Sequence, residues 1–388
     1  MSELDDFRAE TRAWLEANCP QSRRGAFRGF STFNYWGGRK AEFQDEDQKV
    51  WFERMRDKGW TVPEWPVEYG GAGLDKHRAG ILQQELRRIQ AQPPLQSLGI
   101  WMLGPALLHF GTPEQKAEHL PKIARGEIRW AQGYSEPGAG SDLASLSTKG
   151  ELKDGQWVIN GSKIWTTNGD KCDMIFALVR TEPDAPKHQG ISFILVDMDQ
   201  PGVTTKPITL INGDAPFVQT FFDNATAPEG NVVGPRGKGW DVTKYLLGHE
   251  REMIGSSMTN SVTETVSSVA KAKLGADGLK ADPSLRMAIA NHEIESWVLG
   301  IAVERLKDMG KAKQFSQFAP SVLKLMGTEL NYRRGELLMS ISGFDAVNDL
   351  FSEPVHSYLH APANCIAGGS NEVQLNILSK RALGLPEL

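Results

Sequence analysis

Residues 157–197, WVINGSKIWTTNGDKCDMIFALVRTEPDAPKHQGISFILVD, decide the fold class of this 388-residue chain. They contain the runs WVIN, KIWTT, MIFALV and ISFILV, which are rich in apolar and β-branched residues and separated by Gly, Asp, Asn and Pro. That composition is typical of β-strands joined by turns. Two further runs, VTTKPI and VQTFF, follow before residue 234. The sequence therefore predicts a β domain over residues 130–237.

The stretches on both sides of this β domain have a helical pattern instead. Upstream, Thr112-Pro113-Glu114 predicts the start of a helix, because threonine accepts a backbone N–H there and proline needs no partner for its own nitrogen. Downstream, the apolar residues of RMAIANHEIESWVLGIAVERL recur at helical spacing. We therefore expect helical domains at residues 1–129 and 238–388, and an α+β fold.

Composition excludes several classes of protein. The formal net charge is −5 and no block of Lys or Arg is present, so we expect no nucleic-acid partner. The three cysteines, Cys19, Cys172 and Cys365, lack the paired spacing of a zinc site or a disulfide framework, so we expect no metal site and a reducing compartment. The first residues are acidic and no span approaches ~20 apolar residues, which predicts a cytoplasmic protein with no membrane attachment.

The segment GWDVTKYLLGHEREMIGSSM places an acid on the apolar face of a predicted helix. The positions that share this face are Val242, Tyr245, Leu246, His249, Glu250, Met253 and Ile254. A carboxylate desolvated there would have the raised pKa that a base working near neutral pH needs. From this pattern alone, Glu250 could also reach solvent at the edge of the face or pair with a basic neighbour. His249 could equally be a core hydrogen-bond donor, and Arg251 points about 100° away from Glu250.

Two glycines, Gly368 and Gly369, precede a last helix that we expect to begin near Ser370. Ser370 can cap this helix, whose inward residues would include Val373 and Ile377. Glycines let the backbone approach a ligand closely, and unpaired N–H groups at a helix start can bind a carbonyl or phosphate oxygen. An ordinary turn and cap is the alternative. The same two interpretations apply to the loop EPGAGSD, which lacks the strand–GxGxxG–helix context of a dinucleotide fold.

Four motifs in this order, YSEPGAGSDL, INGSKIWTTNG, GHER and AGGSNEVQ, make the chain resemble the acyl-CoA dehydrogenase family. The resemblance runs from about residue 40 to the C-terminus and, among the family's branches, is greatest with the large subunit of bacterial pimeloyl-CoA dehydrogenase. It implies a β-barrel-like middle domain between an N-terminal helical domain and a C-terminal four-helix bundle. It also implies an FAD-dependent enzyme that oxidises an acyl-CoA thioester to the trans-2-enoyl-CoA and passes the electrons to an electron-transfer flavoprotein.

The resemblance also assigns the residues of the site, with FAD laid between the β domain and the C-terminal helices. The residues that match FAD contacts are Gln132, Tyr134, Ser135, Gly140, Ser141, Trp165, Thr167, Ser370 and Glu372. The residues that match the surroundings of the substrate are Ser141, His249, Arg251 and Gly369. The thioester carbonyl would accept a hydrogen bond from the backbone N–H of Gly368, which helps to stabilise the enolate that develops as the α-proton leaves.

The position of the catalytic base differs between branches of the family. One branch carries its glutamate immediately before the glycine that matches Gly369, and this chain has Gly368 there. A second branch, which includes isovaleryl-CoA and long-chain acyl-CoA dehydrogenases, carries it at the position of Glu250. Helical periodicity and the motifs thus select the same residue, and we expect Glu250 to take the α-proton.

Departures from the family's pattern leave the assembly and the activity open. The stretch AKAKLGADGLKADPS lacks an Arg-x-x-Phe-Gly run that in many members reaches a neighbouring subunit's FAD, and Leu337 stands nearest to an expected glutamine. We therefore hypothesise a hetero-oligomer in which a related small subunit completes the FAD site. Ala367, in place of the usual aromatic residue, leaves room for a bulky or branched acyl group. The alternatives are a non-catalytic or half-site subunit of such a heteromer, and an oxygen-using flavin oxidase or monooxygenase on the same fold.

Overall fold

The structure, a computed structural model, describes residues 2–25, 35–248, 265–312, 314, 316–348 and 352–386. The chain forms two compact units. The first unit contains Met1–Ile208 and Ala215–Leu246, and the second contains Thr209–Asp214 and Leu247–Leu388. A short piece of the middle of the chain, Thr209–Asp214, therefore belongs to the second unit.

The first unit opens with helices that their caps and apolar faces specify. These are α1 (Glu3–Asn18), α2 (Glu46–Asp57), α3 (Lys76–Arg88), α4 (Gly104–Phe110) and α5 (Pro113–Ala124). Thr112 caps α5 as predicted, in a capping box with Gln115. The buried carboxylate of Glu85 on α3 binds three guanidinium groups, those of Arg8, Arg12 and Arg88. Since Arg8 and Arg12 lie on α1, this cluster joins the two helices.

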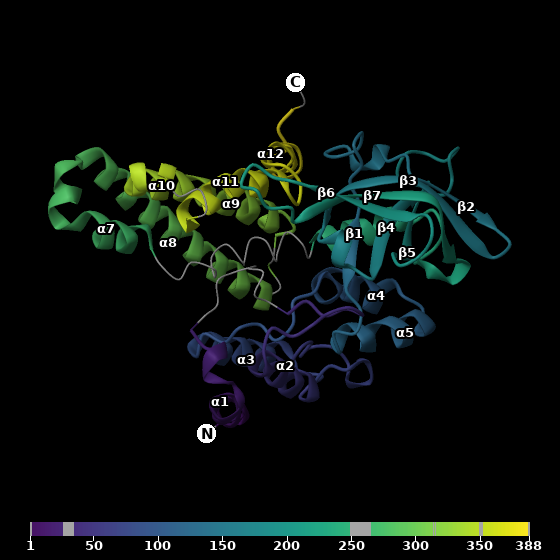
Figure 1. Cartoon of the computed structure of the whole chain (residues 1–388), viewed down its shortest axis with the longest axis horizontal. Helices are drawn as coiled ribbons and strands as arrows, with labels where there is room; N and C mark the ends of the chain where they lie inside the picture. Colours follow the sequence, from purple (N-terminus) through teal and green to yellow (C-terminus); the bar gives the residue numbers. More distant parts are fainter. Residues whose placement is uncertain are drawn as a thin grey trace. The chain divides into compact units, whose positions relative to one another are not determined.

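Within the described part of the chain, an eight-stranded mixed sheet follows these helices. Its strands are β1 (Trp130–Gly133), β2 (Lys149–Lys153), β3 (Gln156–Thr167), β4 (Met174–Arg180), β5 (Ile191–Asp197), β6 (Val203–Ile208), β7 (Phe217–Pro228) and β8 (Val232–Val233). They run in the order β6-β7-β3-β2-β4-β5-β8, and β1 pairs in parallel with β4 (Figure 1). All but the last residue of β4 and of β5 are buried, which explains their unbroken apolar sequences.

The runs WVIN and KIWTT, predicted as separate strands, are one strand in the structure. Together they form most of β3, which pairs with β7 and shifts its register at Gly161 and again before Thr166. Gly161 has φ of +144°, and a Cβ there would lie 2.8 Å from the Cα of Thr148. Glycine therefore lets the chain stay in the sheet where any other residue would meet the neighbouring backbone.

The second unit is helical. Its helices are α7 (Val266–Ala281), α8 (Pro283–Lys311), α9 (Ala319–Ser342), α10 (Phe344–Asn348), α11 (Glu353–Ile366) and α12 (Asn371–Ile377). Helices α7, α8, α11 and α12 all pack against α9 (Figure 1). The order of helices, sheet and helices expected from the sequence is therefore confirmed.

Helix α12 begins as predicted, with Ser370 as its N-cap, but its buried face differs from the prediction. The expected inward residues, Val373 and Ile377, are only half-buried. The buried residues of α12 are instead Asn371 and Gln374. These polar side chains point inward because Asn371 hydrogen-bonds to the buried Lys324 and Gln374 hydrogen-bonds to the turn before the helix.

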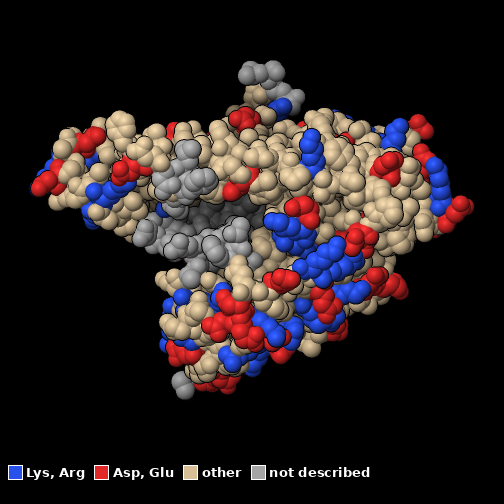
Figure 2. Space-filling model, viewed as in Figure 1, with Lys and Arg blue, Asp and Glu red and all other residues tan. Residues whose placement is uncertain are grey.

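The surface of the first unit carries charges of both signs. On the face drawn in Figure 2, Lys and Arg are interspersed with Asp and Glu over its helices, so this face has no field of one sign. All three cysteines are free. Among the helices that the structure describes, none is long and apolar enough to cross a membrane. The same residues contain no group of three or more His, Cys, Asp or Glu placed to hold a metal ion.

Candidate functional site

The loop that follows β1 carries several of the residues expected to bind FAD. It forms a tight turn in which Glu136 and Ala139 exchange two backbone hydrogen bonds, both of 3.0 Å. The Glu136 carboxylate accepts the backbone N–H groups of Ser147 and Thr148 at 2.7 and 2.9 Å. The loop is thus fixed by its own turn and by the segment that leads into β2.

A buried ion pair ties this loop to β3. Lys163 Nζ lies 2.7 Å from Glu136 Oε1 and donates to the Tyr134 carbonyl at 3.3 Å; the two charged side chains are 0% and 5% exposed. Burial raises the pKa of Glu136, but the charge and hydrogen bond of Lys163 outweigh this effect and lower that pKa to about 2. Burial lowers the pKa of Lys163 to about 8, although Glu136 opposes the change. The loop is therefore held by two charges that water does not screen.

Trp165 on β3 combines a strained backbone with an exposed ring. Its φ is +62°, in the left-handed region that bulky residues avoid, and it lies at a bulge in the strand. The residue is 52% exposed, and its ring meets Phe217 edge-on at 6.0 Å between centroids. The N–H of Ile164 donates to the Ser135 carbonyl at 2.8 Å, so this bulge lies beside the loop after β1. Since neither the left-handed backbone nor the exposed ring of Trp165 stabilises the fold, the two together indicate that this residue binds a ligand.

Two hydroxyls of this loop and the amide of Gln132 on β1 fit FAD. The side chains of Gln132, Ser135 and Ser141 have no hydrogen-bond partner among the described residues. A Cβ added to Gly138 or Gly140 would meet no atom within 4 Å, so the turn has open space beside it. Amide, hydroxyl and backbone N–H groups can donate hydrogen bonds to the carbonyl oxygens of a flavin and to the oxygens of a pyrophosphate.

Two other expected cofactor residues are less accessible. The ring of Tyr134 is buried and lies edge-on to Phe176 and Phe193. A contact between Tyr134 and a cofactor would therefore use the backbone and not the ring. Thr167 is half-buried at the end of β3, where it pairs with Phe217 of β7.

In the second unit, Gly368 and Gly369 form the turn between α11 and α12. Their φ values are +66° and +90°, a region that favours glycine. Gln374 Nε2 donates to both of their carbonyl oxygens, at 3.3 and 3.1 Å. Within the described residues, neither backbone N–H has a hydrogen-bond partner. The turn therefore presents unpaired donors of the kind expected for a thioester carbonyl.

The two remaining expected cofactor residues lie at the start of α12. Ser370 Oγ accepts the Val373 N–H at 3.4 Å and so caps the helix. Glu372 is exposed in the first turn, where hydrogen bonds from its own backbone N–H and from Ser370 lower the pKa of its carboxyl. A carboxylate there repels a second anion, so this turn suits a neutral carbonyl oxygen better than a phosphate.

The sequence analysis missed the residues that hold this turn, Lys324, Asn371 and Gln374. All three are buried and connected by hydrogen bonds to the turn or to its flanks. The sequence contained one weak signal for them, because Lys324 stands at helical spacing from the buried Gly327 and Thr328 on α9.

The expected base, Glu250, and its neighbours His249 and Arg251 lie outside the described residues. The helix that leads to them is described over residues 239–248. Val242 and Leu246 on this helix are buried, as the periodicity predicts. Tyr245, predicted on the same face, is only half-buried. The inward face is therefore confirmed at Val242 and Leu246, and the placement of Glu250 remains a prediction.

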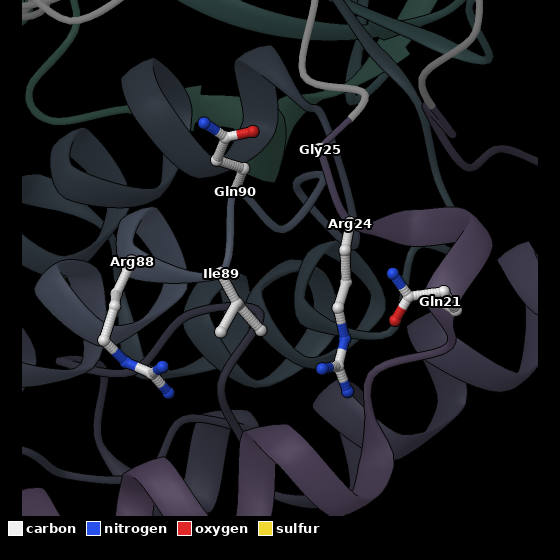
Figure 3. Close-up of a pocket in the computed structure, with 6 residues that line it drawn as sticks. All are labelled: Gln21, Arg24, Gly25, Arg88, Ile89 and Gln90. Carbon is white, nitrogen blue, oxygen red and sulfur yellow. The ribbon is translucent and has the colours of Figure 1, made fainter.

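A pocket in the first unit involves none of the expected site residues. It is lined by Gln21, Arg24, Gly25, Arg88, Ile89 and Gln90 (Figure 3). Arg24 donates to the carbonyls of Glu16 and Cys19 at the end of α1, and Arg88 pairs with the carboxylates of Glu16 and Glu85. Both arginines that line the pocket are therefore already engaged, and the pocket carries no argument for an anionic ligand.

Three family models match the chain, in order along it. They describe the acyl-CoA dehydrogenase N-terminal, middle and C-terminal domains, and match residues 2–127, 131–225 and 237–383. The chain is 35% identical over 396 residues to acyl-CoA dehydrogenase IpdE1 of Mycobacterium tuberculosis, with 100% of this chain and 99% of that protein covered. It is also 35% identical to IpdE1 of Mycolicibacterium smegmatis over 402 residues, with the same coverage.

Solved structures show the same fold. The Tcur3481-Tcur3483 steroid ACAD matches with a TM-score of 0.79 and 28% identity, over 99% of this chain and 98% of that chain. The ChsE4-ChsE5 complex from Mycobacterium tuberculosis matches with a TM-score of 0.74 and 28% identity, over 100% of this chain and 99% of that chain.

Proposed function

The chain belongs to the acyl-CoA dehydrogenase family, whose members are flavoprotein oxidoreductases that act on acyl-CoA, and we propose that it is FAD-dependent. It removes one hydrogen from the α carbon and one from the β carbon of an acyl thioester, which gives the trans-2-enoyl-CoA. The proposal rests above all on the exposed and strained Trp165, on the unpaired hydroxyls of the loop beside it and on the unpaired amide of Gln132 on β1.

The residues that we propose to bind FAD are Gln132, Tyr134, Ser135, Gly140, Ser141, Trp165, Thr167, Ser370 and Glu372. FAD, when bound, accepts the hydride that leaves the β carbon. Trp165 would stack on the flavin, and the unpaired donors near it would hydrogen-bond to the cofactor.

Glu250 takes the α-proton in this proposal, and Gly368 stabilises the charge that forms as the proton leaves. The Gly368 N–H donates to the thioester carbonyl, and such a fixed donor contributes several kcal/mol where water is excluded. The residues that surround the substrate are Ser141, His249, Arg251 and Gly369. The buried positions Val242 and Leu246, on the helix that leads to Glu250, support an inward carboxylate.

An anaerobic titration with a panel of acyl-CoA thioesters tests the proposal. The FAD absorbance should bleach in proportion to added substrate, and mass spectrometry should find a product lighter by two hydrogens. Rapid reoxidation of the reduced protein by air would favour an oxidase or monooxygenase on the same fold. Protein that binds no flavin, or whose flavin no acyl-CoA bleaches, would contradict the proposal.

Replacement of Trp165 separates cofactor binding from stability. In Trp165→Gly we expect the FAD dissociation constant to rise about 10- to 100-fold, because stacking on an aromatic side chain contributes about 1–3 kcal/mol. The Tm of the apoprotein should not fall, since glycine relieves about 1–2 kcal/mol of left-handed strain and costs about 0.5–1 kcal/mol of chain entropy. Trp165→Phe, which keeps a ring, is the matched control and should retain most of the affinity. Wild-type FAD affinity in Trp165→Gly would contradict the stacking role.

We propose that the substrate is an acyl-CoA with a bulky acyl group. Ala367 and Gly368 place no large side chain at the turn. The solved relative described as a steroid ACAD supports a polycyclic, steroid-derived acyl-CoA as the first member of the panel. The resemblance to pimeloyl-CoA dehydrogenase remains a prediction, which pimeloyl-CoA in the same panel tests.

A related subunit completes the FAD site in this proposal. Two solved relatives are described by pairs of protein names, Tcur3481-Tcur3483 and the ChsE4-ChsE5 complex. In the stretch where the Arg-x-x-Phe-Gly run is missing, α7 is kinked at Gly275, whose φ is +65°. Native mass spectrometry of protein purified from its own host should find a second subunit; a single polypeptide that is fully loaded with FAD and active would refute the heteromer. Electrons pass from the complex to an electron-transfer flavoprotein.

We also propose domain boundaries and a cellular location. The domains are residues 1–129, 130–237 and 238–388, so the middle domain begins with β1 at Trp130. We propose a cytoplasmic location, which is consistent with the three free cysteines. Fractionation of the native host is the measurement that checks the location.

A further inference from the structure

Lys324 on α9 is a buried lysine with no role in the chemistry described so far. The residue is 0% exposed. Its Nζ donates to Asn371 Oδ1 at 2.7 Å and to the Cys365 carbonyl at 3.0 Å. Neither acceptor is charged, and no carboxylate of the described residues forms an ion pair with it. Burying an ammonium group on neutral acceptors costs free energy, so these two contacts require an explanation.

The two acceptors of Lys324 lie on either side of the glycine turn. Cys365 belongs to the last turn of α11, and Asn371 is the first residue of α12. Gly368 and Gly369 lie between them in the chain. One ammonium group on α9 therefore holds both ends of a short segment whose two glycines would otherwise leave it free to change shape.

Asn371 is fixed by more than Lys324. Its Oδ1 also accepts the Thr328 hydroxyl at 3.0 Å, and its Nδ2 donates to Glu329 Oε1 at 2.7 Å. The amide thus connects the buried ammonium of Lys324 to the carboxylate of Glu329, which is exposed. Because both ends of the amide are hydrogen-bonded, the orientation of Asn371 is determined.

Gln374 determines which way the turn faces. It donates to the carbonyl oxygens of Gly368 and Gly369. In a trans peptide the C=O and the following N–H point in opposite directions, so the N–H groups of Gly369 and Ser370 point away from Gln374. Gln374 thus fixes the direction of the Gly369 N–H. The Gly368 N–H belongs to the preceding peptide, in the short stretch between the Cys365 carbonyl that Lys324 binds and Gly369.

We propose that Lys324 is a positioning residue, which through Cys365 and Asn371 holds the Gly368–Gly369 turn in the shape that aims its N–H groups at the thioester carbonyl. This inference rests on the proposed function, which assigns the Gly368 N–H to that carbonyl. Lys324 itself touches neither substrate nor cofactor. It acts on the reaction only through the turn.

Lys324→Met tests the inference because methionine keeps the volume and removes the donors. In the holoenzyme we expect kcat to fall about 10- to 100-fold, since a displaced donor loses stabilisation of the transition state, and KM to change by less than about 3-fold. The FAD content should stay at the wild-type level. Hydrogen exchange of peptides from residues 363–377, measured without substrate, should become faster, while exchange of residues 285–299 should not.

Two further variants keep the test decisive. Asn371→Ala leaves Lys324 in place and should give the same fall in kcat, and the double variant should be no worse than either single one because both act through one turn. Ile289→Ala is the matched control: it removes a buried side chain from the cluster of Val266, Ala270 and Ile341. It should lower the Tm and leave kcat unchanged.

The outcomes separate this inference from the proposed function. A kcat in Lys324→Met and Asn371→Ala within about 3-fold of the wild type, or a fall matched by Ile289→Ala, overturns the positioning role. Unchanged exchange of residues 363–377 in both variants also overturns it. If no acyl-CoA bleaches even the wild-type flavin, the proposed function fails instead, and the exchange measurement still decides whether Lys324 holds the turn.

Discussion

Glu250→Gln should lower kcat/KM about 10³-fold, the largest effect on activity that we expect from a single side chain. Removal of a general base typically costs 10²- to 10⁴-fold, and glutamine has nearly the volume of glutamate but cannot accept the α-proton. The FAD content and the Tm should remain at wild-type values, because a neutral amide is no harder to bury than a carboxylate. Stopped-flow bleaching of the flavin by acyl-CoA under anaerobic conditions measures the effect.

The control for this prediction is Glu304→Gln, which changes an exposed glutamate on α8 and should bleach at the wild-type rate. Glu250→Asp should retain part of the activity, since the carboxylate remains but is shorter by one methylene. Wild-type bleaching in Glu250→Gln would remove Glu250 from the mechanism. A chain that binds FAD but has no base would then be a half-site subunit, and its partner would carry out the chemistry.

Lys163→Met should destabilise the first unit by about 3–5 kcal/mol, the largest effect on stability that we expect. The change leaves the Glu136 carboxylate buried with hydrogen bonds from Ser147 and Thr148 but with no opposite charge. Urea unfolding of the apoprotein, followed by tryptophan fluorescence, measures it. All the tryptophans except Trp297 belong to the first unit, so the signal reports on that unit.

The double variant Glu136→Gln/Lys163→Met is the control for the pair. It removes both charges, so it should recover much of the stability that Lys163→Met loses. A double variant as unstable as Lys163→Met would show that the loss comes from packing and not from an unpaired charge.

The same pair predicts how stability depends on pH. The pKa of Glu136 is about 2 in the folded chain and 4.5 ordinarily, so the unfolded chain binds the proton first as the pH falls. The stabilisation by Glu136 is therefore complete above about pH 4.5 and is lost between about 4.5 and 2, by about 3 kcal/mol in total. Glu136→Gln should remove this part of the pH dependence. If the stability of Glu136→Gln fell as steeply between about pH 4.5 and 2 as that of the wild type, Glu136 would not be the cause of this pH dependence.

Local signals in the sequence were enough to predict the layout of the chain. The cap at Thr112, the cap at Ser370 and the apolar runs of β4 and β5 each depend on a few consecutive residues, and the structure confirms them. Helical periodicity likewise predicted the buried Val242 and Leu246. The motifs predicted the family, which the comparisons confirm. They also supplied the expected site residues, whose roles remain predictions.

Only the tertiary structure decided which polar groups are buried and what they hold. Glu136 pairs with Lys163 across 27 residues, and Lys324 binds Asn371 across 47. Periodicity ranks side chains by polarity, so it placed Val373 and Ile377 inside α12, where the structure buries Asn371 and Gln374. It could not do otherwise, because a polar group can be buried only when a distant partner satisfies it, and the identity of that partner depends on how the chain is folded.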